Sequence, residues 1–258
     1  MSFSIYPISQ ATTATFAELY FRLTFLFFVE TGSKRVLTHD GKELIGEEGD
    51  VFVFPPGSIV TMENRPRLTE SYRATGISYS QELIDLAAQS VNGVAPSHGP
   101  QLLKSNPDES KRILAPIKAG MTQGKLPQPV LTHRQLEPII WLQSHGIQLQ
   151  KSTTLDPIAS VRQLIETDLA HPWQASEISR ALGMSQPTMR RRLSEAGQGF
   201  AKILLFTRLE RGLTLLQTSS KPITQIAYEC GFKTPAHFSD AFKKRFGIRP
   251  KDIRTPAK

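Results

Sequence analysis

The chain has 258 residues, enough for one large domain or two of ordinary size, and a hydrophobic content of 39% is sufficient for a packed core. The net charge is +8, and residues 151–258 hold 18 Lys and Arg against 9 Asp and Glu, whereas residues 1–150 hold 13 against 14. Cys230, as the single cysteine, excludes an internal disulfide, and the apolar run at 23–29 is too short to span a membrane, which takes about 20 residues. No secretion signal is evident, so we expect a cytoplasmic protein without membrane contact, whose basic C-terminal part binds nucleic acid.

The first third of the chain alternates β-favouring residues with turn signals. The Asp40-Gly41 pair is typical of a tight hairpin, and DVFVFPPG at 50–57 is typical of a strand that enters a turn. Several short strands at this spacing predict a small β-sandwich or barrel. Residues 90–101, SVNGVAPSHGPQ, are typical of a loop.

Helical patterns follow at 108–121 and 132–149. Residues 150–157, QKSTTLDP, are polar and end in a cap-and-proline pair, so we place a domain boundary there, between domains at 1–150 and 151–258. Beyond it the sequence predicts helices at 157–169, 174–182, 186–195, 200–217, 222–230 and 235–246, and a short turn after Pro250. The predicted fold class is therefore α+β with two domains, a β-rich N-terminal domain with helices and an all-α C-terminal domain of about seven helices.

The stretch IAYECGFKTPAHFSDAFKKRF at 226–246 shows how two of these helices pack. Phe238, Phe242 and Phe246 are four residues apart, so their rings share one face of a helix and form a buried stripe. Thr234 before Pro235 predicts an N-cap followed by proline at the first helical position. Together with the shorter helix that ends before Gly231, the pattern predicts a helix-turn-helix with a charged outer face; Cys230 is expected to be a small buried residue.

A similar unit occurs earlier, because EISRALGMSQPTMRRRL at 177–193 parallels QIAYECGFKTPAHFSDAF at 225–242. The two units are separated by a predicted helix of about 18 residues, which spans about 27 Å. With the turns included, the two recognition helices are expected to lie roughly 34 Å apart, one turn of B-DNA. This spacing favours a protein whose two units bind successive major grooves on the same face of a DNA duplex.

These residues resemble the DNA-binding domain of AraC/XylS-type bacterial transcription regulators. PITQIAYECGFKTPAHFSDAFKKRFGIRP at 222–250 matches the proline, Ile-Ala, Gly-Phe, Phe, Phe-Lys-Lys, Gly and Pro positions of that family in order, and the resemblance covers residues 156–255. GEEGDVFVFPPGSIV at 46–60 is similar to the Gly-Asp-strand-Pro-Gly signature of a cupin-type barrel. The resemblance implies a helix-turn-helix regulator, most simply an activator, that binds promoter DNA and contacts RNA polymerase, with an N-terminal cupin-like domain that dimerises, senses a small molecule, or both.

The candidate DNA-contacting residues lie on the two recognition helices and their caps. In the first unit Arg190 and Arg191 are expected to face the groove and Arg192 to reach phosphate, because consecutive helical positions diverge by about 100°. Lys243, Lys244 and Arg245 are expected to contact phosphate. Asp240 stands where the family often has arginine; its carboxylate could accept a hydrogen bond from cytosine N4, but it would equally repel phosphates. The second unit could therefore read a base there or act mainly through contacts to the DNA backbone. The full candidate set is Ser185, Gln186, Thr188, Arg190, Arg191, Arg192, Thr234, Ala236, His237, Ser239, Asp240, Lys243 and Lys244.

The N-terminal part offers fewer candidates. No two histidines are adjacent or separated by one residue, so the sequence predicts no metal site, no cofactor and no catalytic site. Four aromatic residues could line a pocket for a small apolar effector, or could be barrel core: Tyr20, Phe21, Phe25 and Phe28. The segment 132–149 could pack against a second subunit in a homodimer or on its own barrel.

Two alternatives from other classes fit the composition less well. One is a cupin enzyme, metal-dependent or metal-free, with a DNA-tethering tail; the absence of a readable metal site disfavours its metal-dependent form. The other is a nonspecific architectural DNA binder, which equal affinity for promoter and random duplexes would indicate.

Overall fold

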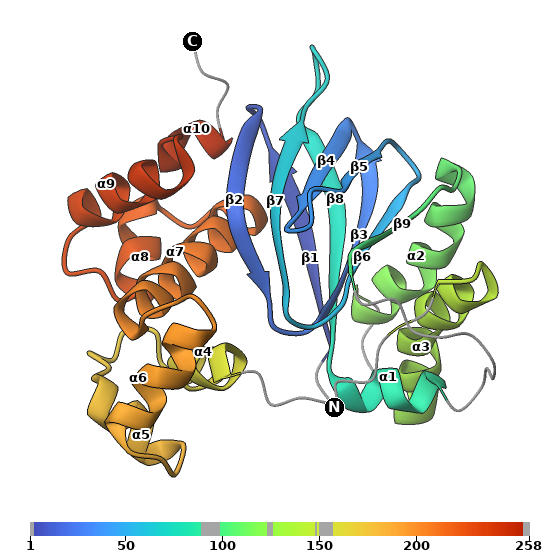
Figure 1. Cartoon of the computed structure of the whole chain (residues 1–258). Coiled ribbons are helices and arrows are strands. Elements are labelled where there is room, and N and C mark those ends of the chain that lie inside the picture. The colour runs from blue at the N-terminus through green and yellow to red at the C-terminus, as the bar shows by residue number, and fades with distance from the viewer. Residues whose placement is uncertain (1–2, 89–98, 123–125, 148, 150–156, 255–258) are drawn as a thin grey trace. The chain divides into compact units, whose positions relative to one another are not determined.

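A computed structural model describes residues 3–88, 99–122, 126–147, 149 and 157–254. The chain divides into two compact units, Met1–Ser152 and Thr153–Lys258. The first is a β-sandwich with three helices, and the second consists of helices, as the α+β prediction required (Figure 1). No helix among the described residues is both long and apolar enough to cross a membrane.

Two antiparallel sheets face each other in the N-terminal unit. The five-stranded sheet has the order β1-β8-β3-β6-β9, and the four-stranded sheet has the order β2-β7-β4-β5. Their bounds are β1 Phe3–Gln10, β2 Ala14–Phe21, β3 Thr24–Thr31, β4 Ser33–Thr38, β5 Glu43–Gly46, β6 Val51–Phe54, β7 Ser58–Arg65, β8 Tyr72–Tyr79 and β9 Gln101–Leu103.

The five-stranded sheet is buried on both faces, because β3 sends alternate side chains to two different cores. Phe25 and Phe27 point between the sheets, whereas Leu26 and Phe28 belong to a core shared with the helices. These helices are α1 (Gln81–Ala88), α2 (Pro107–Thr122) and α3 (Gln128–Ser144), which lie on one side of the sandwich (Figure 1). Burial of the outer face explains why β3 and β6 are almost continuously apolar.

The structure refines three predictions for this unit. Asp40-Gly41 lies in the β4–β5 hairpin, but the loop is longer than two residues, because β4 ends at Thr38 and β5 begins at Glu43. The helix expected at 132–149 runs instead from Gln128 to Ser144 and ends before Gly146, whose φ of 81° favours glycine. The loop expected at 90–101 lies mostly outside the described residues, and its last residue begins β9.

The C-terminal unit follows the predicted helices to within two residues at their ends. The bounds are α4 Pro157–Thr167, α5 Ala175–Ala181, α6 Gln186–Glu195, α7 Phe200–Thr218, α8 Ile223–Glu229, α9 Pro235–Phe246 and α10 Pro250–Arg254. Helices α4, α5 and α6 form one lobe, and α8, α9 and α10 form another. Helix α7 contacts α4 in the first lobe and α8, α9 and α10 in the second, so it connects both (Figure 1).

Candidate nucleic-acid interface

Helix α6 is the second helix of the first helix-turn-helix, and its start is fixed by local capping. The Ser185 side chain accepts a hydrogen bond from Thr188 N at 3.3 Å, and Pro187 occupies the first turn, where its missing N–H has no helical partner to lose. Met189 and Leu193 are buried. Because these two residues turn inward, the three arginines between them lie on the outer face of α6.

The outward face of α6 is cationic. Gln186, Arg190, Arg191 and Arg192 are all exposed, and Arg191 pairs weakly with Glu195 at 3.8 Å. Thr188 is half-buried, and its hydroxyl lies 2.8 Å from the Ser185 Oγ. Ser185 and Thr188 therefore shape the helix start, while the arginine side chains are available for a groove or a phosphate.

Helix α9 occupies the same place in the second helix-turn-helix. Thr234 accepts a hydrogen bond from His237 N at 3.2 Å, and Pro235 lies in the first turn. The stripe of Phe238, Phe242 and Phe246 is buried, as the four-residue spacing predicted. Both recognition helices are thus built by the same local chemistry, an oxygen cap followed by proline and an inward apolar stripe.

The outward face of α9 differs from that of α6. Its exposed side chains include one acid, Asp240, and the cations of this helix are confined to its last turn; the exposed residues are Ala236, His237, Asp240, Lys243 and Lys244. Ser239 is half-buried and donates to the Pro235 carbonyl at 2.9 Å, so its hydroxyl is already used within the helix. Helix α9 presents its first turn with almost no positive charge.

Arg245 does not behave as the sequence predicted. Its side chain is only 8% exposed, its guanidinium carbon lies 3.8 Å from the centre of the Phe206 ring, and its Nη2 lies 4.0 Å from Glu210. The expectation that Arg245 contacts phosphate is therefore wrong. Lys243 and Lys244 face solvent. They point away from Arg245, because each residue along a helix is turned by about 100° from the one before it.

Two glycines let the second lobe pack closely. A Cβ on Gly231 would lie 2.2 Å from the Leu169 carbonyl oxygen of the α4–α5 loop, and the φ of Gly231 is 76°. Arg208 of α7 donates to the same carbonyl, at 2.9 Å. A Cβ on Gly212 of α7 would lie 2.7 Å from the Phe238 ring. The turn of the second helix-turn-helix therefore rests directly on the first lobe.

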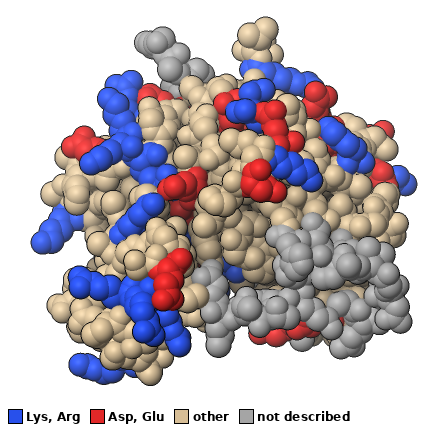
Figure 2. Space-filling model, viewed as in Figure 1, with Lys and Arg blue, Asp and Glu red and all other residues tan. Residues whose placement is uncertain are grey.

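Basic side chains are spread across the visible surface of the helical unit, including its lower end near α5 and α6 (Figure 2). Cys230 is buried, as expected, and burial raises the pKa of its thiol to about 12. Ser179 sits in the buried face of α5, and its hydroxyl donates to the Ser176 carbonyl at 3.0 Å. Because Cys230 is buried and the Ser179 hydroxyl is bonded within α5, the exposed cations are the chemically available groups.

The four aromatic residues proposed for an effector pocket do not all share one space. Phe21 and Phe25 have ring centroids 5.5 Å apart between the sheets, but Phe28 stacks on Trp141 of α3 on the opposite face of β3. Tyr20 is buried. A role for these residues in ligand binding stays a prediction.

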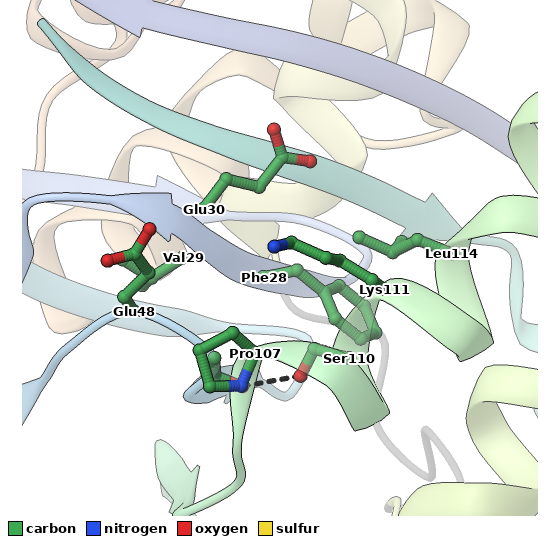
Figure 3. A pocket seen from close by; sticks show the side chains of 9 residues that line it. Phe28, Val29, Glu30, Glu48, Pro107, Ser110, Lys111 and Leu114 are labelled. Carbon is green, nitrogen blue, oxygen red and sulfur yellow. Dashed lines mark hydrogen bonds between the residues drawn. The ribbon is translucent and has the colours of Figure 1, made fainter.

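A small pocket opens beside α2, between β3 and the turn that precedes β6 (Figure 3). It is lined by Phe28, Val29, Glu30, Glu48, Gly49, Pro107, Ser110, Lys111 and Leu114. Its volume is about 20 Å³, which is room for about one water molecule. This pocket is too small for an apolar effector.

A buried cation that was not predicted from the sequence lies between the sheets. Lys34 of β4 has no exposed surface, and its Nζ donates to Asn64 Oδ1 at 2.5 Å and lies 3.4 Å from Met62 Sδ. The Nζ also lies 4.2 Å from the centre of the Phe27 ring and 5.3 Å from that of Tyr72. The signal was the alternation of β4, which places Lys34 on the same face as buried Val36 and Thr38.

No carboxylate among the described residues pairs with Lys34. Desolvation by burial lowers the pKa of its ammonium to about 7. The ring of Tyr72 on β8 lies beside Lys34, and its buried hydroxyl makes no hydrogen bond within the described structure. Asn64, the acceptor for Lys34, donates in turn to Gln10 at 2.9 Å. The sandwich interior thus holds a cation surrounded by neutral groups, which is unusual for a structural core.

Known proteins with similar sequences also carry a helix-turn-helix in the part that matches the helical unit. A family described as helix-turn-helix domain matches residues 178–255. The HTH-type transcriptional regulator YdeO of Shigella flexneri is 30% identical over 107 residues, which is 42% of this chain and 42% of YdeO. The DNA-binding dual transcriptional regulator Rns of Escherichia coli is 35% identical over 95 residues, 37% of this chain and 36% of Rns. The chain matches less than half the length of each of these relatives.

The fold of the whole chain is similar to that of ToxT from Vibrio cholerae strain SCE256. An apo form of ToxT that carries one substitution has a TM-score of 0.69 at 15% identity, over 97% of this chain and 95% of ToxT. Another ToxT structure from that strain has an unsaturated fatty acid bound, with a TM-score of 0.68 at 16% identity over 99% of this chain and 96% of ToxT. At this identity the likeness shows the fold alone. Residues 178–255 thus carry a helix-turn-helix domain, and this agrees with the resemblance of the C-terminal unit to AraC/XylS-type regulators.

Proposed function

We propose that the chain is a sequence-specific DNA-binding transcription regulator. Residues 151–258 would bind promoter DNA, and residues 1–150 would form a regulatory and dimerisation domain. The observation that carries the proposal is the pair of capped recognition helices, α6 and α9, joined by α7 within one helical unit and exposing cationic side chains. By the same proposal the DNA-bound chain contacts RNA polymerase and activates transcription, which the family resemblance supports.

The two recognition helices contribute different contacts to DNA binding. Helix α6 reads bases, because Gln186 and Arg190 project from its exposed face, and an arginine fork matches O6 and N7 of guanine. Helix α9 anchors the protein, because its cations, Lys243 and Lys244, lie in the last turn while Asp240 lies nearer the start. Phosphate neutralisation by both helices supplies much of the affinity.

The primary test is a selection of duplexes from a random library by the full chain, followed by affinity measurement at fixed salt. A selected duplex should bind about 10³-fold or more tightly than random duplex of the same length. Equal affinities would identify a nonspecific architectural binder and remove the regulator proposal.

Two single substitutions test whether α6 contacts bases and α9 contacts phosphates. Arg190→Ala should relax the preference at one base position, with roughly a five- to hundredfold loss of discrimination there. Lys244→Ala should weaken all sequences alike and reduce the slope of log K against log salt by about 1. Arg67→Ala is the matched control, because Arg67 is exposed in the N-terminal unit and pairs there with Glu48. If Arg190→Ala and Lys244→Ala have the same effect, the assignment of the two helices is wrong.

We further propose that the N-terminal unit senses a small apolar carboxylic acid. The buried Lys34 ammonium supports this, since it has only neutral partners and a carboxylate would supply its missing counter-charge. The Phe27 and Tyr72 rings beside it would pack on an apolar tail, and the free Tyr72 hydroxyl would donate to the acid group. The fatty acid bound to ToxT adds support from a protein of the same fold.

Oleate and oleyl alcohol are a matched pair of probes for this proposal, because only oleate carries a carboxylate. Oleate should raise the melting temperature of the full chain, and oleyl alcohol should leave it nearly unchanged. In Lys34→Met the response to oleate should fall to that of the alcohol. An unchanged oleate response in Lys34→Met would show that the acid does not bind at this lysine.

A further inference from the structure

A buried ion cluster ties the two lobes of the helical unit together. Arg162 of α4 has a side chain only 3% exposed, and its Nη1 donates to Glu210 Oε2 at 2.6 Å. Glu210 lies in the middle of α7 and is 14% exposed. Its other oxygen, Oε1, lies 4.0 Å from Nη2 of Arg245, which comes from the last turn of recognition helix α9. One carboxylate therefore bridges a helix of the first lobe and the recognition helix of the second.

The surroundings of Arg245 make its position specific. The Phe206 ring of α7 lies 3.8 Å from its guanidinium carbon, and Phe206 and Glu210 are one helical turn apart. Arg245 is thus held by stacking and charge from one face of α7. Helix α4, which carries Arg162, packs against α6 as well as α7. The cluster therefore couples the placement of α9 to the lobe that holds α6.

We propose that Glu210, held between Arg162 and Arg245, is a positioning residue that fixes the separation and angle of the two recognition helices. By holding the two helices in place, Glu210 determines the number of base pairs between the DNA element that α6 contacts and the DNA element that α9 contacts. The inference rests on the proposed regulator function and adds how its binding-site spacing is determined. A charged cluster suits this role, because the short hydrogen-bonded Arg162–Glu210 pair is directional and the same carboxylate attracts Arg245, which stacks on the Phe206 ring.

The test uses a selected duplex whose two elements are moved apart by one or two base pairs. Each inserted base pair shifts the second element by about 3.4 Å and rotates it by about 35°. Wild-type affinity should fall by about tenfold or more for one insertion, a loss comparable to that of a mismatched base pair. Glu210→Gln should lose less than about threefold. Its affinity for duplexes with a single element should equal that of wild type.

Glu229→Gln is the matched control, because it makes the same charge change on α8, where Glu229 pairs with Lys221. It should keep the wild-type spacing profile. If Glu210→Gln does not fold, the triple variant R162M/E210L/R245M replaces it, since apolar replacement of a whole buried ion cluster often preserves stability. The triple variant should also tolerate insertions.

The outcomes separate the two proposals. If the selection enriches no sequence, the regulator function itself fails. If wild type binds a selected duplex with sharp spacing dependence and the folded Glu210 variants keep that profile, the positioning role of Glu210 is overturned. A flattened spacing profile in the variants, with single-element binding intact, establishes it.

Discussion

In the N-terminal unit the Lys34 ammonium is enclosed by a carboxamide oxygen, a thioether sulfur and two rings, whereas the C-terminal unit encloses the Glu210 carboxylate between two guanidinium groups. Burial lowers the pKa of Lys34 to about 7. Burial also raises the pKa of Glu210, although the attraction of Arg162 and Arg245 opposes that shift.

The two buried charges differ in whether the fold supplies a group of opposite charge. The Glu210 cluster contains its own counter-charges, so it can hold α4, α7 and α9 together without a ligand. Among the described residues Lys34 has no partner of opposite charge. Its ammonium therefore destabilises the sandwich unless it loses its proton or an anion binds beside it. In the helical unit two arginines offset part of the cost of burying a charge, whereas within the described structure Lys34 receives no opposite charge.

The largest expected effect comes from breaking the complete cluster. Arg162→Met removes the 2.6 Å partner of Glu210 and leaves the buried carboxylate, among the described residues, with only Arg245, at 4.0 Å, so the free energy of unfolding should fall by about 3–5 kcal/mol. Urea denaturation monitored by circular dichroism measures the change. The R162M/E210L/R245M variant should recover most of the loss; a loss below about 1 kcal/mol in Arg162→Met would show that the cluster is not well packed.

Lys34→Met should act in the opposite direction and should depend on pH. The pKa of Lys34 is about 7 in the folded chain and about 10.5 when unfolded, so the unfolded chain binds more protons between these values. Wild-type stability should therefore rise with pH across this window, relative to Lys34→Met, by about 1.4 kcal/mol per unit at most.

Denaturation of both proteins at pH 6, 8 and 10 checks this linkage. The stability difference in favour of Lys34→Met should be largest near pH 6 and should shrink as pH rises. A difference that stays constant with pH would mean that Lys34 has the same pKa in the folded and unfolded chains, and would contradict its burial as an unpaired cation.

The smallest effect on stability is expected at an exposed charge. Arg191 is 73% exposed and lies 3.8 Å from Glu195, so Arg191→Ala should change the free energy of unfolding by less than about 0.5 kcal/mol. Its affinity for a selected duplex should nevertheless fall. Parallel denaturation and binding titrations measure both; a large loss of stability would contradict the view that only the buried charges support the fold.

Local pattern was sufficient for most of the helical unit. Each recognition helix is specified by neighbours within four residues, such as Thr234 before Pro235 and the inward stripe of Phe238 and Phe242, and its bounds were predicted accordingly. The shift of α3 to 128–144 arose because Pro127 and the turn at Gly146 override the apolar spacing at 132–149. The sandwich was recognisable as a class, but its strand order depends on pairings between distant segments.

By itself the sequence determined the caps, the apolar stripes, the repeated helix-turn-helix and the concentration of positive charge after residue 150, because each depends on near neighbours or on composition. Only the tertiary structure decided which charges are buried. In the sequence, Lys243, Lys244 and Arg245 are three consecutive cations with nothing to distinguish them. In the fold, Arg245 is buried because it packs against Phe206 and Glu210, which are more than thirty residues away. Lys34 is likewise ordinary in a strand until β7 and β8 bring Asn64 and Tyr72 to it, because burial is a property of what packs opposite a side chain.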